Sequence, residues 1–300
     1  MDNRQPALQR SQELFTSPVE LQNVLMRAAK STRPKAKSLV ITFVGGSASG
    51  KTSVAARLGT RMDTKSLLFS QDRFQRGIDF LENKSTPYRF DDPRNFDLPG
   101  CEAALRRLAG GLAVDVPDFD MIANHRIDTE RLDPAPIIIW EGIYAAYSPE
   151  LESLADIIAY IDVPYGLRTL RRISRYFRRG EAIEIDDLSL PAYHMLNYVL
   201  KAEEDFVVKQ IPKADYLLRF RSHRLDNELR TLHDAAAKYS HRWHRPKGSP
   251  IQTKTFAGIT FSIFQDAYGI YEHEHPLYVA KLDPDTIQNA LKNWQTVLSF

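Results

Sequence analysis

The chain has 300 residues, 43% hydrophobic and 26% charged, which is ordinary for a globular protein with an apolar core. Forty basic residues face 38 acidic ones, and a net charge of +2 provides no global field for binding nucleic acid or a membrane surface. The longest apolar runs are strand-length, and one cysteine, Cys101, excludes an internal disulfide and fits a reducing cytosol. We therefore expect a cytoplasmic protein with no nucleic-acid or membrane partner, and homo-oligomerisation stays open.

The N-terminal segment, residues 1–36, begins polar and then contains a helix start signal. Ser17-Pro18-Val19-Glu20 is a capping box with proline at the first helical position. We predict a short helix from there to about Lys30, and then a linker over residues 31–35.

Residues 37–220 alternate β-branched runs with helical stretches, which is the pattern of a doubly wound parallel sheet. We therefore predict an α/β core with about five strands. The candidate strands are Leu39–Val44, Leu67–Ser70, Ile137–Trp140, Ile157–Val163 and Tyr216–Phe220.

Residues 221–300 change character and are predicted to form an extra α+β segment packed on the core. A polar helix is expected near 224–239, followed by a Pro/Gly break at 245–250 and a strand-like stretch at Thr255–Phe264. A last amphipathic helix should start after Asp283-Pro284, with one face formed by Ile287, Leu291, Trp294 and Leu298.

The residues after the first candidate strand fit the phosphate-loop pattern G-x-x-x-x-G-K-[ST] in full. Small residues let the backbone curl so that consecutive N–H groups meet phosphate oxygens at the positive end of a helix. We expect Lys51 to reach the β- and γ-phosphates of a nucleoside triphosphate and Thr52 to ligate Mg²⁺. The expected nucleotide-binding residues are Gly45, Gly46, Ser47, Ala48, Ser49, Gly50, Lys51, Thr52 and Ser53.

Two acids follow candidate strands at the carboxyl edge of the sheet, where ligands bind in such folds. Glu141 ends the run Ile137–Trp140, at the place of a magnesium-associated carboxylate. Asp72 follows Ser70 and is placed to accept the proton of an attacking hydroxyl. Either acid alone could cap a strand, but two of them after a phosphate loop favour catalysis.

The run Leu167–Gly180 carries arginines spaced for one helix face. Such a face could be solvated and paired with the acidic residues that follow, or it could bind nucleic acid. We favour a helical lid that closes over the triphosphate, because its arginines could stabilise charge on the transferring phosphoryl group. We expect roughly two to four of them to touch phosphate. The arginines are Arg168, Arg171, Arg172, Arg175, Arg178 and Arg179.

In content and order these motifs resemble the uridine kinase/phosphoribulokinase family, over about Leu39 to Phe220. The resemblance implies a P-loop fold with a five-stranded parallel sheet. It also implies transfer of the γ-phosphoryl group of ATP to a primary hydroxyl of a ribose-bearing small molecule. The matching stretches are Gly45–Thr52, Ser70–Phe74, Phe90–Asp97, Pro117–Asp120, Trp140–Ile143 and the arginine-rich helix.

The family pattern implies roles for individual residues. Asp72 is then the general base, Asp91 binds the ribose hydroxyls, and Glu141 is the magnesium-associated acid. The lid or catalytic arginines would be Arg172, Arg175 and Arg179, and the acceptor pocket would add Phe119, Asn124 and Arg126.

Several positions depart from the uridine kinase pattern. The usual Tyr-Asp-Phe segment reads Phe119-Asp120-Met121, and Asn124 stands where a histidine reads the pyrimidine. Gln75 replaces a tyrosine three residues after Asp72, and Glu181 stands where an arginine is often seen. We therefore expect a ribosyl or sugar-like acceptor, with uridine and cytidine either poor substrates or bound through other contacts.

Three other functions were weighed against a nucleoside kinase. A phosphoribulokinase-like sugar-phosphate kinase fits the same motifs, whereas a nucleotide switch needs no acceptor base such as Asp72. A nucleic-acid module needs many basic contacts, which the near-neutral charge disfavours.

His241 and His244 with the segment 272–275 could also form a zinc site, but histidines in polar surface segments are commoner and no cysteine lies nearby.

Overall fold

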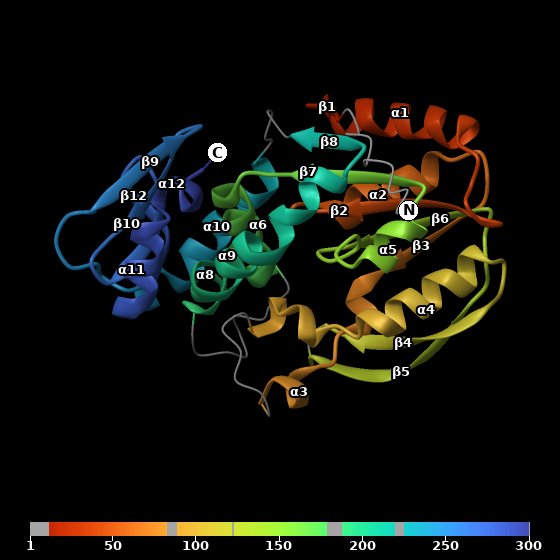
Figure 1. The fold of residues 1–300 in the computed structure, drawn as a ribbon. Helices are drawn as coiled ribbons and strands as arrows, with labels where there is room; N and C mark the ends of the chain where they lie inside the picture. Colours follow the sequence, from red (N-terminus) through yellow and green to blue (C-terminus); the bar gives the residue numbers. More distant parts are fainter. Residues whose placement is uncertain (1–11, 83–88, 122, 179–187, 220–224, 300) are drawn as a thin grey trace, which may run out of the picture.

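The structure is a computed structural model of the 300-residue chain (Figure 1). The residues it describes are 12–82, 89–121, 123–178, 188–219 and 225–299. The predicted roles of Arg179 and Glu181, and the predicted helix end at Gly180, lie outside these residues.

Within the described residues, a parallel sheet of six strands forms the centre of the molecule (Figure 1). All five predicted strands are present, and a sixth was missed because its three residues show no strand pattern. This sixth strand, β1, pairs with β8 through Glu13↔Tyr216 and Phe15↔Leu218. In spatial order the strands are β1 (Glu13–Phe15), β8 (Tyr216–Arg219), β7 (Ile157–Asp162), β2 (Leu39–Val44), β6 (Ile137–Gly142) and β3 (Ser66–Ser70).

Helices cover both faces of this sheet, because alternate residues of each buried strand point to opposite sides. Ile41 and Phe43 of β2 belong to a core shared with α1, α2 and α6, whereas Val40 and Val44 belong to a core shared with α4 and α5. The predicted doubly wound α/β fold is confirmed. The helices are α1 (Pro18–Ser31), α2 (Lys51–Arg61), α4 (Leu98–Ala109), α5 (Pro149–Leu154) and α6 (Tyr165–Arg178).

Helix α1 confirms the predicted helix but not the predicted capping box. Pro18 occupies the first helical position as expected, yet the Ser17 side chain makes no capping hydrogen bond. Burial of Leu21 and Leu25 against the sheet holds the helix instead. Packing of an apolar face therefore replaces the local cap as the reason for this helix.

A β-ribbon lies below α4 in Figure 1, and Arg126 near its turn donates to the carbonyls of Phe74 and Gln75 that follow β3. Its strands are β4 (Val114–Asp120) and β5 (His125–Leu132), which pair antiparallel. Between β3 and α4 the chain passes through short helical turns. These are Gln71–Phe74, α3 (Ile78–Glu82), Arg89–Asp91 and Pro93–Asn95.

A long helical segment precedes β8 and changes its winding several times. It contains α8 (Leu190–His194), a π-helical turn at Met195–Val199, α9 (Leu200–Ala202), a second π-helical turn at Glu203–Val207 and a 3-10 turn at Val208–Lys213. Turns of π-helix are rare and redirect the side chains at the insertion.

The C-terminal part is an α+β unit with its own antiparallel sheet, in the order β12-β11-β10-β9. The predicted strand at Thr255–Phe264 is instead a hairpin, because the chain turns at Ala257 and Gly258, which have φ values of 50° and 82°. Its elements are α10 (Asp226–Tyr239), β9 (Gln252–Phe256), β10 (Ile259–Ile263), β11 (Ala267–Glu272), β12 (His275–Lys281), α11 (Pro284–Lys292) and α12 (Trp294–Val297).

This unit packs on α6, so that one apolar core runs from the parallel sheet into the antiparallel one. Leu170 and Ile173 of α6 belong to the same buried cluster as Phe261 and Ile287. Asp283 caps α11 as predicted, since its carboxylate accepts a hydrogen bond from the Thr286 N–H at 2.9 Å. The predicted last helix is divided in two at Asn293.

Among the described helices, none combines the length and the apolar character needed to cross a lipid bilayer.

Candidate active site

The phosphate loop joins β2 to α2 at the centre of the sheet, as its pattern predicts. Ala48 and Gly50 have φ values of 60° and 92°, in the left-handed region, and the Ser49 N–H donates to the Gly46 carbonyl at 3.1 Å. Residues that alternate between left- and right-handed backbone form concavities that bind anions. Gly45 is required because a Cβ there would lie 2.6 Å from the Ile161 carbonyl oxygen of β7.

Lys51 is the first residue of α2 and is buried at the mouth of this loop. Its ammonium group donates to the Gly46 carbonyl at 3.1 Å. Burial lowers the pKa of Lys51, whereas the nearby carboxylates of Glu141 and Asp72 raise it. The two acids predicted from strand ends therefore lie beside the lysine of the loop.

Glu141 lies buried at the end of β6 and is held by hydroxyl groups. The Ser70 hydroxyl donates to a Glu141 carboxylate oxygen at 2.6 Å, and the Asp72 N–H donates to the same Ser70 hydroxyl at 3.3 Å. Burial and the charge of Asp72 raise the pKa of Glu141, while Lys51 and hydrogen bonds from Ser70 and Thr52 lower it.

These contacts bring the Thr52 hydroxyl and the Glu141 carboxylate together at the mouth of the loop. Hard oxygen ligands of this kind suit Mg²⁺, which takes one or two protein oxygens and keeps its remaining sites for water and phosphate. The residues present therefore fit a magnesium–triphosphate complex at this position.

Asp91 ends the short helical turn Arg89–Asp91 and lies near enough to Asp72 and Lys51 for their charges to act on it. Burial raises its pKa to about 6; Arg172 opposes the rise, whereas the charges of Asp72 and Glu203 add to it. The Tyr144 hydroxyl donates to the Asp91 carbonyl and so fixes the backbone beside this carboxyl group. Asp72, Asp91 and Arg172 consequently share one electrostatic neighbourhood next to the phosphate loop.

Helix α6 carries the predicted arginines from Arg168 to Arg178 and lies directly on the loop. Arg172 donates to the Ser47 hydroxyl at 3.3 Å, and Arg171 donates to the Ser49 carbonyl at 3.3 Å. Arg175 follows one turn later and is partly exposed.

Arg168 departs from the shared arginine face that the spacing predicted. It is buried, only 4% exposed, and forms an ion pair with Glu203 at 3.0 Å. The helix turns this arginine inward because Leu167 and Leu170 on either side are also buried in the core.

Hydrogen bonds link the turn after Asp72 to the end of the β-ribbon, where the acceptor pocket is predicted. Gln75 donates to the Met121 sulfur at 3.7 Å, and Arg126 donates to the Gln75 carbonyl at 3.1 Å. Asn124 has a φ of 55°, and its carbonyl accepts from the Ile78 N–H at 2.8 Å. Phe119 is 9% exposed. These residues tie the turn after Asp72 to the β-ribbon.

Sequence reasoning missed two buried polar residues at this site. Gln71 accepts a hydrogen bond from the Tyr144 N–H at 2.8 Å and so joins β3 to the turn after β6. Glu203 lies 35 positions after Arg168, its ion-pair partner. Its only signal in the sequence is an acid that follows the apolar residues Leu200 and Ala202.

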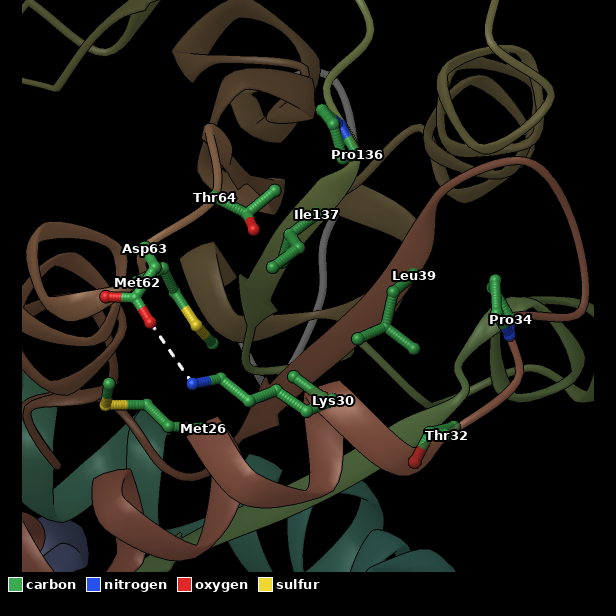
Figure 2. Close-up of a pocket in the computed structure, with 11 residues that line it drawn as sticks. Met26, Lys30, Thr32, Pro34, Leu39, Met62, Asp63, Thr64, Pro136 and Ile137 are labelled. Atoms are coloured by element: carbon green, nitrogen blue, oxygen red, sulfur yellow. Dashed lines mark hydrogen bonds and ion pairs between the residues drawn. The ribbon is translucent and has the colours of Figure 1, made fainter.

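A cavity of about 270 Å³ lies at the opposite edge of the sheet (Figure 2). Leu39 and Ile137 begin their strands there, and Lys30 pairs with Asp63 at its rim at 3.1 Å. Strands of six residues separate this cavity from the phosphate loop by roughly 20 Å at a rise of about 3.3 Å per residue. The cavity therefore takes no part in the site described above.

Two of the residues considered as zinc ligands, His244 and Glu272, have other partners. His244 lies 2.8 Å from an Asp266 oxygen, and Glu272 pairs with His233 at 3.0 Å. The described part of the chain contains no group of three side chains placed to hold a metal ion.

The sequence pattern of the phosphoribulokinase / uridine kinase family matches residues 40–223. The chain belongs to this family. The match begins in β2 and ends just beyond β8, so it contains the phosphate loop, both strand-end acids, Asp91 and the arginine helix. The predicted family is confirmed, and the protein is a P-loop kinase that phosphorylates an alcohol group.

Curated relatives agree with this membership. The chain is 34% identical to a uridine kinase of Chloroflexus aurantiacus over 150 residues, which are 49% of this chain and 72% of that protein. It is 33% identical to a uridine kinase of Lactococcus lactis over 185 residues, covering 58% of this chain and 89% of the relative.

Solved structures share the fold at lower identity. A candidate fructose transport system kinase from Silicibacter sp. TM1040 has a TM-score of 0.55 at 19% identity, covering 67% of this chain and 98% of that one. A candidate uridine kinase from Bacillus stearothermophilus has a TM-score of 0.51 at 17% identity, with the same coverage. At these identities the likeness concerns the fold.

Proposed function

We propose that the protein transfers the γ-phosphoryl group of ATP to a hydroxyl of a ribosyl or sugar-like small molecule. The observation that carries this proposal is the meeting of Lys51, Asp72, Asp91 and Glu141 at the mouth of one phosphate loop. A nucleotide switch would need the lysine and the magnesium ligands but no further carboxylates beside the γ-phosphate.

Each residue of the loop end has a role in the proposed step. The loop N–H groups and Lys51 hold the phosphates, and Thr52 with Glu141 would hold Mg²⁺. Bound ATP supplies the phosphoryl group, whose charge the cation helps to neutralise. Arg172 and Arg175, with Arg179 beyond them in the sequence, are proposed to stabilise charge on the transferring group.

The acceptor end supplies the base. The acceptor hydroxyl oxygen bonds to the γ-phosphorus as the bond from that phosphorus to the bridging oxygen of ADP breaks. We propose that Asp72 takes the hydroxyl proton, because its backbone N–H is fixed on Ser70 and its carboxylate lies beside Lys51. Asp91 is proposed to accept hydrogen bonds from neighbouring hydroxyls of the acceptor, with Arg172 beside it.

The substituted positions support an acceptor other than uridine or cytidine. A pyrimidine needs partners for its carbonyl and amide groups, and a site that lacks one partner loses discrimination by orders of magnitude. Phe119 offers no hydroxyl, and Gln75 already donates to Met121. Phe119, Asn124 and Arg126 are proposed to shape the acceptor pocket. A sugar phosphate, bound as in a phosphoribulokinase-like enzyme, is the second candidate, because Arg172 lies near Asp91.

The remaining assignments belong to the same proposal. Residues 37–220 would form the kinase core, with 1–36 as an N-terminal helix and linker and 221–300 as an extension; the family match over 40–223 supports this division. The partners would be ATP, Mg²⁺ and a small-molecule acceptor, in the cytoplasm, without nucleic acid or membrane.

A thermal-shift screen tests the proposed acceptor class. Nucleosides and pentose phosphates are added singly to the protein with Mg²⁺ and a non-hydrolysable ATP analogue, since a bound ligand raises stability by RT ln(1 + [L]/Kd). We expect the analogue to raise Tm by itself and a riboside or sugar phosphate to raise it further. No shift from the analogue would contradict the nucleotide site, and an additional shift from uridine or cytidine alone would contradict the proposed acceptor.

A further inference from the structure

The ion pair between Arg168 and Glu203 stands out because it is buried directly beneath the phosphate loop. Two of its nitrogen–oxygen distances are 3.0 and 3.1 Å, so the guanidinium and the carboxylate face each other through two contacts. Arg168 is 4% exposed and Glu203 is 8% exposed. Glu203 begins a π-helical turn, which redirects its side chain relative to a regular helix.

Arg168 uses its remaining donors to join three parts of the fold. Its Nε donates to the Val163 carbonyl just after β7 at 2.9 Å, and its Nη1 donates to the Ser47 carbonyl of the phosphate loop at 3.3 Å. The guanidinium also lies over the Tyr165 ring, 5.0 Å from its centroid. One side chain therefore connects the central sheet, the arginine helix and the loop.

The loop backbone is in direct contact with the pair. A Cβ at Gly46 would lie 1.9 Å from Arg168 Nη1 and 2.5 Å from Glu203 Oε2. Lys51 donates to the carbonyl of this same Gly46, and the charges of both Arg168 and Glu203 act on Lys51. A displacement of the pair would consequently move the loop at the residue that positions the lysine.

Stability alone gives little reason to keep such a pair. Removing two charges from water is costly, and well-packed apolar residues of similar volume often replace a buried ion pair without loss of stability. We propose that Arg168 and Glu203 are positioning residues that hold the phosphate loop in its triphosphate-binding shape. This inference rests on the proposed nucleotide site and goes beyond it by assigning part of the ATP affinity to an ion pair that does not touch phosphate.

The test separates positioning from folding by using a double variant. Arg168→Met/Glu203→Leu replaces the pair with apolar side chains of similar size, whereas Glu203→Gln leaves the arginine charge buried without its partner. The surface pair Arg106–Glu102 on α4, at 2.8 Å and without contact to the loop, gives the matched control Arg106→Met/Glu102→Leu. For each full-length variant, Tm and the Kd for a non-hydrolysable ATP analogue with Mg²⁺ are measured.

We expect Glu203→Gln to lower Tm and to weaken analogue binding by about tenfold or more, as leaving one partner of a buried pair unmatched is strongly destabilising. The double variant should recover most of the Tm but keep the tenfold loss in binding. The control should retain the parental Kd. Parental binding by the double variant would overturn the proposal. An ion pair that only stabilises the fold can be replaced by apolar side chains that pack equally well, without any change in binding.

A second variant keeps the test decisive if the double variant does not fold. Arg168→Lys retains a positive charge opposite Glu203, but one ammonium group cannot reproduce the planar fork that bridges Ser47, Val163 and the carboxylate. We expect at least a fivefold rise in Kd with Tm little changed, and a parental Kd would contradict the proposal. Analogue binding by the parent without phosphorylation of any acceptor would refute the proposed function but not this inference.

Discussion

The two ends of the site differ in how their polar groups are used. At the loop end, Lys51, Thr52 and Glu141 converge on the mouth of the phosphate loop. At the acceptor end, Gln75 and Arg126 are bonded to the β-ribbon and the turn that carries Asp72. The polar groups of the loop end therefore point to phosphate and magnesium binding, whereas Gln75 and Arg126 hold the proposed acceptor end together by internal hydrogen bonds.

Removal of the loop lysine should cause the largest loss of activity among the variants, and it should impair only the loop end of the site. Lys51→Ala should lower phosphoryl transfer by about a thousandfold or more, because a donor aimed at transition-state charge is lost. Within the described residues the Nζ makes one hydrogen bond, to the Gly46 carbonyl, so the loss of Tm should be small compared with the loss of activity. The exposed Lys65, between α2 and β3, provides the control Lys65→Ala. Near-normal turnover in Lys51→Ala, measured by ADP release, would refute a kinase site here.

Substitution of the proposed base separates the two ends. Asp72→Asn keeps the shape but removes the proton acceptor, so kcat should fall by about a hundredfold or more while ATP affinity is nearly unchanged. Glu141→Gln should instead increase the Mg²⁺ concentration needed for half-maximal rate. Asp63→Asn, at the far edge of the sheet, serves as control. A fully active Asp72→Asn enzyme would assign Asp72 to strand capping alone.

The ionisation of Asp91 allows the role of the acceptor end to be tested through the pH dependence of activity. With a pKa raised by burial to about 6, its carboxylate forms as pH rises through that value, and kcat/KM for the acceptor should rise with it. Asp91→Asn should lower the plateau by about tenfold and remove this part of the profile, as estimated from lost hydrogen bonds to a charged group. An unchanged pH profile in the variant would show that another group titrates.

The same carboxyl group gives a stability test with a defined sign. Its raised pKa means that the folded state binds more protons than the unfolded state between the ordinary value, 3.8, and about 6. Its ionisation therefore destabilises the fold as pH rises through that range, and the penalty is complete above it. Asp91→Asn should gain Tm relative to the parent as pH is raised from 4 to 7. A constant difference across this range would contradict the assigned shift.

Arg126 gives the smallest expected effect and tests whether the acceptor end is bonded internally. Its guanidinium donates to the Phe74 and Gln75 carbonyls and pairs with Asp97 at 3.8 Å. Arg126→Ala should lower Tm by a few degrees, on the scale of one or two lost hydrogen bonds. Acceptor KM should rise only a few-fold, with ATP KM unchanged. A hundredfold rise in acceptor KM would show direct contact with the substrate.

The loop end could be predicted from the sequence because its signals are local. Gly45 to Thr52 occupy consecutive positions, and parallel strands bring Asp72 and Glu141 to the same edge. The acceptor end depends on contacts that no local pattern carries, such as Gln75 with Met121 across 46 positions. Arg168 illustrates the same limit, since the helical spacing places it with the other arginines of α6, while its ion-pair partner Glu203 lies 35 positions away.

Strands and turns show the same contrast between local signals, which the sequence carries, and contacts between distant residues, which it does not. Strands such as β2 and β6, buried along their whole length, were predicted because their apolar runs are continuous. Strand β1 was missed because three residues acquire their structure only by pairing with β8. The hairpin at Ala257-Gly258 was missed because the surrounding stretch reads as one strand, and the turn is made by two residues with positive φ.

Steady-state kinetics on uridine, cytidine, other ribosides and pentose phosphates, at fixed ATP and Mg²⁺, tests most directly whether the acceptor is something other than a pyrimidine nucleoside. We predict that a non-pyrimidine riboside or a sugar phosphate is the preferred acceptor, with kcat/KM for uridine and cytidine at least about a hundredfold lower, the discrimination expected when a polar partner is missing. A kcat/KM for uridine or cytidine near or above about 10⁵ M⁻¹s⁻¹, ordinary for a good substrate, would contradict this prediction.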